Sequence, residues 1–219
     1  MNDLNYMIKI AEEKWLHQLY NYCQPLFIKS KISSHDHNHH YRVWEYCKEI
    51  LTALYPNNNI NYELIEGCII ASFFHDTGLS NTVDEFHGHE SKKICQDYFK
   101  NKNLEIPKNF SAILWAIEKH DDKNYQPKKQ EEAESLLSII CNADDLDAFG
   151  NIGVIRYTEI YLLRGVAINE LPELVIQNID NRFRNFKNTY KDYPELYNKH
   201  QARYLLTRNF FTKLQEEFI

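Results

Sequence analysis

Residues that form turns are scarce in this chain, and their scarcity limits the folds that it can adopt. The 219 residues include 6 glycines and 6 prolines, few turn signals for a chain of this length. Apolar residues recur at the spacing of an α-helix, and no segment longer than a few residues alternates as a half-buried strand would. The sequence therefore predicts an all-α fold.

The apolar spacing also indicates where the helices lie. Seven apolar faces precede Gly165 and two longer patterns follow it, so the predicted helices include residues 4–19, 43–54, 64–73, 94–99, 113–117, 136–144, 152–162, 174–190 and 205–214. Ser111 is predicted to cap the fifth of these helices. We predict a single domain, 1–219, in which residues 166–219 form a helical extension packed on the core.

Composition and charge limit where in the cell the protein is expected and which molecules it is expected to bind. No apolar run approaches the roughly 20 residues of a membrane-spanning helix, and Met1–Ala11 lacks the pattern of a signal peptide. The five cysteines are widely spaced within apolar patterns, which predicts reduced core residues in a cytoplasmic protein. A net charge of −6 disfavours non-specific nucleic-acid binding. It does not exclude a nucleotide substrate, because a bound divalent cation would dominate the local field.

Histidines and aspartates gather at two places in the first half of the chain. The segment SHDHNHHYRV, 34–43, is either a solvated histidine run or a source of metal ligands. His75 and Asp76 directly follow the apolar run Ile65–Phe74. Burying both groups without partners would cost free energy on the order of several kcal/mol. The pair therefore requires compensation, by a metal ion, by capping of a helix, or by an ion pair with Arg42.

A third gathering is acidic. In NADDLDAFGNIG, 142–153, Asp144 shares a predicted helix face with apolar residues. A carboxylate on a buried face is unusual unless it is paired or coordinated. Asp145 lies about 100° further round the helix and is predicted on its flank. Asp147 is predicted to cap or bond locally near Gly150.

These three motifs resemble the HD superfamily of metal-dependent phosphohydrolases, in which a histidine, a His–Asp pair and a later aspartate follow in that order. The pattern S-H-D-x-x-H-x-x-R-V is met from Ser34 to Val43, FFHDTG contains the pair, and A-D-x-L-D-A-x-G-x-I-G is met from Ala143 to Gly153. The motif core spans about residues 34–153. The resemblance implies a compact HD-type helical bundle in which ligands converge from three helices.

The resemblance also implies which residues bind metal: His39, His75, Asp76 and Asp144. His75 and Asp76 are in addition the expected catalytic pair. The spacing of His39 to Arg42 and Val43 favours it over His37 and His40, while His35 and Asp36 are expected to shape the loop. Asp145 stands where many relatives carry a basic residue, which makes this site more acidic.

Relatives with two metals add one histidine soon after the His–Asp pair and another at the end of the next helix. His87 and His120 stand at those positions, with His89 competing with His87. Three roles stay open for them: ligands of a second metal, contacts to a substrate phosphate, or no role in the site. If two ions bind, Asp76 is the expected bridge. Two histidines and two carboxylates suit Mn²⁺, Fe²⁺, Co²⁺ or Ni²⁺ better than Mg²⁺.

The function implied by the resemblance is hydrolysis of a phosphate ester or phosphoanhydride in a small phosphorylated substrate, such as a nucleotide, by a metal-activated water. Four basic residues are candidates to hold a distal phosphate: Lys119, Lys123, Lys128 and Arg156. Asp145 and Glu118 are candidates to accept the proton of the water. Two alternatives stay open, a di-iron oxygenase on the same fold and an inactive nucleotide-binding module.

Overall fold

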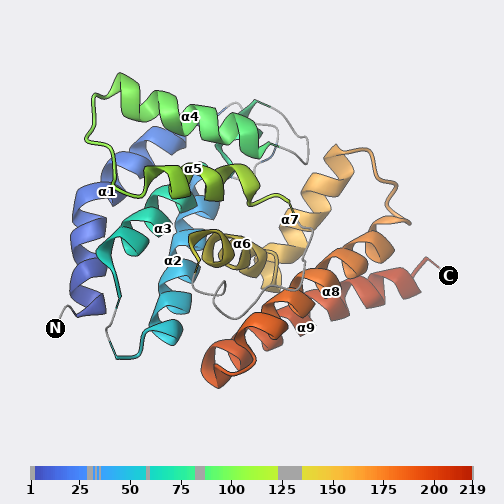
Figure 1. Cartoon of the computed structure of the whole chain (residues 1–219). Helices are drawn as coiled ribbons and strands as arrows, with labels where there is room; N and C mark the ends of the chain where they lie inside the picture. Colours follow the sequence, from blue (N-terminus) through green and yellow to red (C-terminus); the bar gives the residue numbers. More distant parts are fainter. Residues whose placement is uncertain are drawn as a thin grey trace. The chain divides into compact units, whose positions relative to one another are not determined.

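The computed structural model describes residues 3–28, 32, 34, 36–57, 60–81, 87–122 and 135–218. Within these ranges the chain contains nine α-helices and one short 3-10 helix, η1, and no strand (Figure 1). The α-helices are α1 (Leu4–Leu26), α2 (His37–Leu54), α3 (Tyr62–Phe74), α4 (Gly88–Asn101), α5 (Phe110–Lys119), α6 (Leu136–Asp147), α7 (Gly150–Leu163), α8 (Leu171–Tyr190) and α9 (Pro194–Glu216), and η1 is Thr77–Ser80. The predicted all-α fold is confirmed.

The helices group into two compact units, Met1–Ala143 and Asp144–Ile219. In the first unit α3 packs against α1, α2, α4 and α5, and η1 packs against α1 and α4. In the second unit α9 packs against both α7 and α8, which also contact each other. Helix α6 begins in the first unit and ends in the second. The packing of 166–219 on the core as part of one domain stays a prediction.

Helix α3 forms the core of the first unit. Every residue from Ile65 to Phe74 is buried, as expected of a helix that is apolar on all sides. Its one buried acid, Glu66, accepts hydrogen bonds from Trp15 Nε1 at 2.9 Å and Lys14 Nζ at 2.7 Å. These partners compensate the loss of solvent around the carboxylate. Because α3 ends at Phe74, the His–Asp pair that follows emerges inside the protein.

The N-terminal ends of α2 and α5 are formed differently: a side chain caps α2, whereas α5 has no side-chain cap. Asp36 is the N-cap of α2, and its carboxylate accepts hydrogen bonds from the backbone N–H groups of Asn38 and His39 at 3.0 and 3.1 Å. Asp36 thereby holds His39 in the first turn of α2. The prediction that Ser111 caps α5 is wrong: Asn109 is at the N-cap position. The chain already turns at Phe110, whose N–H bonds the carbonyl of Pro107, so Ser111 lies inside the helix.

Side-chain contacts join the helices of the second unit to one another. The rings of Phe183 on α8 and Tyr204 on α9 stack with centroids 4.0 Å apart. The hydroxyl of Thr207 on α9 accepts a hydrogen bond of 2.7 Å from the N–H of Gly150 at the start of α7. Gly150 has φ +83°, a backbone conformation that a glycine adopts without steric cost.

The cysteines and the helix lengths bear on the predicted setting of the protein. All five cysteines are free thiols, and four of them are buried, as predicted for reduced core residues. None of the helices in the described ranges has both the length and the apolarity needed to cross a lipid bilayer.

Candidate metal centre

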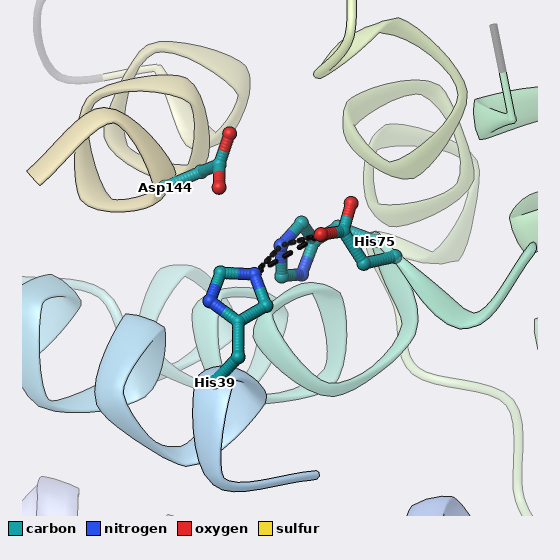
Figure 2. A group of neighbouring side chains, drawn as sticks. His39, His75 and Asp144 are labelled. Atoms are coloured by element: carbon teal, nitrogen blue, oxygen red, sulfur yellow. Dashed lines mark hydrogen bonds and ion pairs between the residues drawn. The ribbon is translucent and has the colours of Figure 1, made fainter. Parts of the chain in front are cut away.

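Three donor groups from two helix ends converge in the first unit. His39 lies in the first turn of α2 and His75 directly after α3 (Figure 2), and Asp76 is the next residue in the chain. The Nε2 atom of His39 is 3.1 Å from Nε2 of His75 and 3.0 Å from Oδ2 of Asp76. Nε2 of His75 is 3.5 Å from the same oxygen. All three side chains are almost completely buried, so these donor atoms face one another away from bulk solvent.

The spacing of these three atoms fits a metal ion. Nitrogen and oxygen ligands lie about 2.1 Å from a first-row divalent metal, so two ligands at right angles around the ion are about 3 Å apart. The observed separations of 3.0, 3.1 and 3.5 Å match that value. Imidazole nitrogen and carboxylate oxygen are also the ligand types that such ions accept.

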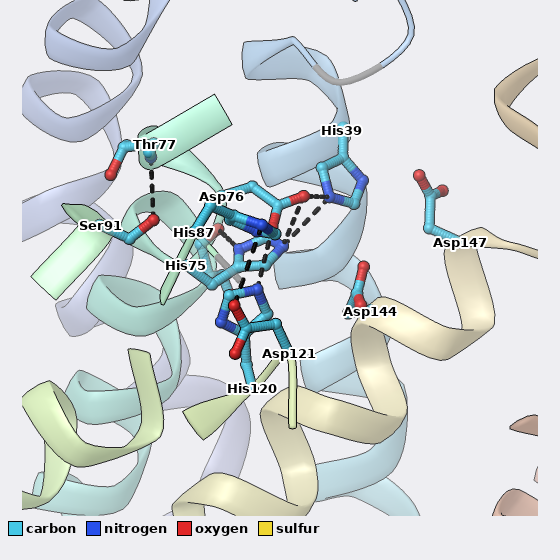
Figure 3. Close-up of polar contacts among 12 residues, drawn as sticks. His39, His75, Asp76, Thr77, His87, Ser91, His120, Asp121, Asp144 and Asp147 are labelled. Atoms are coloured by element: carbon cyan, nitrogen blue, oxygen red, sulfur yellow. Dashed lines mark hydrogen bonds and ion pairs between the residues drawn. The ribbon is translucent and has the colours of Figure 1, made fainter. Parts of the chain in front are cut away.

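A second group of donors lies on the other oxygen of Asp76. His87 is the N-cap of α4 and His120 the C-cap of α5. Their Nε2 atoms are 2.7 and 3.0 Å from Oδ1 of Asp76 (Figure 3). The donor atoms of the three residues lie within 4.8 Å of one another. Asp76 thus presents one oxygen to His39 and the other to His87 and His120.

Backbone carbonyls select the tautomer of two of these imidazoles. Nδ1 of His75 is 2.8 Å from the carbonyl oxygen of Ser72, and Nδ1 of His120 is 2.7 Å from that of Ile117. A carbonyl oxygen only accepts hydrogen bonds, so Nδ1 carries the proton in both rings. Nε2 then presents its lone pair, the form in which a neutral histidine binds metal.

The electrostatics around Asp76 favour its charged form. Burial raises the pKa of the Asp76 carboxyl, but when the surrounding imidazoles are protonated the positive charges of His75 and His87 and hydrogen bonds from His120 and His39 outweigh burial. Together they hold this pKa well below its usual range. The carboxyl is therefore deprotonated at neutral pH, as a metal ligand must be.

Close backbone packing holds His87 beside the His–Asp pair. The N–H of Gly78 donates to the hydroxyl of Ser91, four residues after His87, at 2.9 Å. A Cβ atom on Gly78 would lie 2.6 Å from the carbonyl oxygen of His87, closer than real Cβ atoms approach. Because Gly78 has no side chain, η1 can lie directly against the start of α4.

The acidic motif belongs to the end of α6, and its three carboxylates face two arginines of the second unit. Arg182 donates to Asp145 at 2.6 Å, and Arg156 donates to Asp147 at 2.8 Å. The carboxylate of Asp147 thus has a guanidinium partner nine residues along the chain, and the predicted local bond near Gly150 stays a prediction. Asp144, also buried, lies 3.6 Å from Arg182 and 3.9 Å from Arg156.

Several other candidates from the sequence have different partners. His89 is exposed and contacts Glu118 at 3.2 Å, and Glu118 also pairs with Lys92 at 3.0 Å. The ammonium of Lys119 lies over the ring of Trp115. His37 meets the ring of Tyr20 edge-on with centroids 4.8 Å apart. Three candidates lie outside the described residues: His35, Lys123 and Lys128.

The sequence reasoning missed one residue beside the second donor group. Asp121 accepts a hydrogen bond of 2.8 Å from the N–H of Gly88 and lies 3.9 Å from Nδ1 of His87. The sequence contains a signal for Asp121: the dipeptide His120–Asp121 follows α5 in the same way that His75–Asp76 follows α3.

Comparison with known protein families assigns the chain to one of them. The model of the HD domain family matches residues 37–148, about half of the chain. The chain belongs to the HD domain family. This membership supports, at the level of the superfamily, the metal-dependent phosphohydrolase class that the motifs implied.

A crystal structure of a protein from Lactobacillus plantarum shares the fold. It aligns with a TM-score of 0.62 over 94% of this chain and 97% of its own, at 18% sequence identity. Among curated proteins none matches the chain significantly. The structural likeness therefore bears on the fold alone.

Proposed function

We propose that the protein is a metal-dependent phosphohydrolase that uses two metal ions bridged by Asp76. One observation supports this proposal above the others: each oxygen of the Asp76 carboxylate faces histidine Nε2 atoms at ligand-to-ligand distances, with His39 on Oδ2 and both His87 and His120 on Oδ1. A carboxylate that offers one oxygen to each of two ions would hold them about 3.5–4 Å apart, the spacing of two-metal hydrolase sites.

We assign the remaining protein ligand of the first ion to Asp144. The A-D-x-L-D-A motif places an aspartate there, and the HD family match extends over it. All three carboxylates of this motif lie near the guanidinium groups of Arg156 and Arg182, so the choice of Asp144 rests on the motif. The first ion would then be held by His39, His75, Asp76 and Asp144, and the second by Asp76, His87 and His120.

The donor set suggests which ions bind. Imidazole nitrogens mixed with carboxylates suit Mn²⁺, Fe²⁺, Co²⁺ and Ni²⁺, whereas Mg²⁺ prefers oxygen ligands. Such ions, when bound, would acidify a water molecule and polarise a phosphoryl oxygen beside it. The protein contributes fixed tautomers at His75 and His120 and an ionised Asp76 shielded from solvent.

The substrate in this proposal is a small phosphorylated molecule, most reasonably a nucleotide, in a cytoplasmic setting. The net charge of −6 favours such a substrate over a nucleic-acid polymer, because polymer binding needs a basic surface. Of the basic residues first considered for a phosphate contact, Arg156 is already bonded to Asp147. The metal ions themselves are therefore the main binding site for the scissile phosphate.

A screen of metals against substrates tests this function. Metal-free protein is reconstituted with Mn²⁺, Fe²⁺, Co²⁺, Ni²⁺ or Mg²⁺ and offered nucleoside mono-, di- and triphosphates, cyclic nucleotides and dinucleotide polyphosphates. Phosphate and pyrophosphate are both measured. We expect metal-dependent release of one of them, abolished by His75→Ala. Binding of a nucleotide without release under any metal would instead identify an inactive binding module.

A di-iron oxygenase is the second candidate, and the nitrogen-rich donor set favours it. Four imidazoles and a shared carboxylate surround the two proposed positions, and iron accepts both ligand types. Protein purified from iron-supplied cells and assayed for oxygen uptake separates the two functions. Two irons with substrate-dependent oxygen consumption would support the oxygenase, and phosphate release without oxygen would support the hydrolase.

A further inference from the structure

We propose that Asp121 is a positioning residue that orients His87 as a ligand of the second ion. This inference rests on the two-ion site proposed above. Asp121 directly follows His120 at the end of α5, and its Oδ2 lies 3.9 Å from Nδ1 of His87. On the opposite side of the same ring, Nε2 of His87 lies 2.7 Å from Oδ1 of Asp76 (Figure 3).

Three of the four histidines around Asp76 differ in what lies beside their Nδ1 atom, the ring nitrogen that points away from the carboxylate. Nδ1 of His75 and of His120 donates to a backbone carbonyl, and no side-chain substitution removes that acceptor. Nδ1 of His87 lies 3.9 Å from the carboxylate of Asp121, beyond hydrogen-bond distance but close enough for the negative charge to act on the ring. A carboxylate beside Nδ1 favours the tautomer with the proton on Nδ1, leaves Nε2 for the metal and raises the basicity of the ligand.

Backbone packing explains why this carboxylate is held at the correct place. Oδ2 of Asp121 accepts the N–H of Gly88 at 2.8 Å, so the side chain is tied to the residue after His87. A Cβ atom on Gly88 would lie 2.4 Å from the carbonyl oxygen of Glu118. The start of α4 therefore lies directly against the end of α5. Asp121 connects the two helix ends that carry the two histidines.

A simpler role for Asp121 would be to cap the N-terminus of α4 without affecting the metal. Asparagine and aspartate cap helices about equally well, so Asp121→Asn separates the two roles. The amide oxygen still accepts the N–H of Gly88, while the negative charge beside His87 is lost. Glu118→Gln is the matched control, since it removes a carboxylate from the same end of α5. That carboxylate contacts Lys92 and His89.

Titration of metal-free full-length protein with Mn²⁺, with free Mn²⁺ read by electron paramagnetic resonance, measures both binding steps. We expect Asp121→Asn to weaken the second step by about 10- to 100-fold and to change the first by less than threefold. Glu118→Gln should change neither. A second step within threefold of the unmodified protein in Asp121→Asn would overturn the positioning role and leave the two-ion site standing. A single binding step in the unmodified protein would overturn both.

A measurement on the unmodified protein covers the case in which Asp121→Asn does not fold. In ¹⁵N-histidine protein loaded with Cd²⁺, the ring of His87 should carry its proton on Nδ1 and bind the metal through Nε2. Nitrogen chemical shifts and coupling to ¹¹³Cd report which nitrogen binds. Coordination through Nδ1, or a His87 ring without metal coupling beside two bound ions, would contradict the role proposed for Asp121.

Discussion

Nε2 of His120 lies 3.0 Å from Oδ1 of Asp76, although 44 residues separate the two along the chain. The other oxygen of the same carboxylate lies 3.0 Å from Nε2 of His39. One buried carboxylate therefore faces imidazoles contributed by α2 on one side and by the end of α5 on the other. This division of the two oxygens is the basis of the two-ion proposal.

Substituting either histidine on Oδ1 should remove one ion and leave the other. We expect His87→Ala and His120→Ala each to lower the metal content from two toward one, because His39 and His75 still hold the first ion. Metal analysis of chelator-free preparations measures the stoichiometry. If one ion is present in every sample and the variants only weaken substrate binding, the two histidines contact phosphate instead.

The first site depends on His39 rather than on the neighbouring His37. His39→Ala should abolish binding of the first ion and most activity, and His37→Ala should keep both, because the ring of His37 packs against Tyr20. Metal bound at 100 times its dissociation constant stabilises the folded state by about 2.7 kcal/mol. Thermal unfolding with and without Mn²⁺ should show the same gain in His37→Ala as in the unmodified protein and a smaller gain in His39→Ala, which keeps only the second site. The reverse pattern would mean that the first motif is assigned in the wrong register.

Asp144 and Asp147 should respond differently to loss of charge. Asp147 is completely buried and bonded to Arg156, so Asp147→Asn should lower the free energy of unfolding by about 1–3 kcal/mol, since it weakens a buried charged hydrogen bond. Asp144→Asn should cost less stability but lose the first ion. Urea unfolding of the metal-free variants and metal analysis make the comparison. Retention of the first ion by Asp144→Asn would exclude Asp144 as a ligand.

The contact between the start of α4 and the end of α5 should tolerate no added methyl group. Gly88→Ala places Cβ against the backbone of Glu118, and such overpacking costs about 1–3 kcal/mol. We expect a lower melting temperature and, because His87 shifts with α4, weaker binding of the second ion. Lys93→Ala, on the exposed side of the same helix, should change stability by no more than about 0.5 kcal/mol. Equal melting temperatures for the two variants would contradict this packing argument.

Much of the fold could be predicted because helices depend on local chain properties. The apolar spacing that predicts a helix at 64–73 reflects the 3.6-residue repeat of a single segment, and α3 covers that segment. The position of His75 and Asp76 after a buried helix follows from the same run of apolar residues. The error at Ser111 concerns a helix end, where one turn earlier or later changes little in free energy.

The sequence by itself therefore determined the helices, the order of the candidate ligands and the place of the His–Asp pair at the end of a buried helix. Only the tertiary structure decided that His87 rather than His89 faces Asp76, that Arg182 pairs with Asp145 from 37 residues away, and that Asp121 lies beside His87. The reason is physical: helical periodicity sets which way a side chain points from its own axis, whereas distances between separate helices depend on how their surfaces pack.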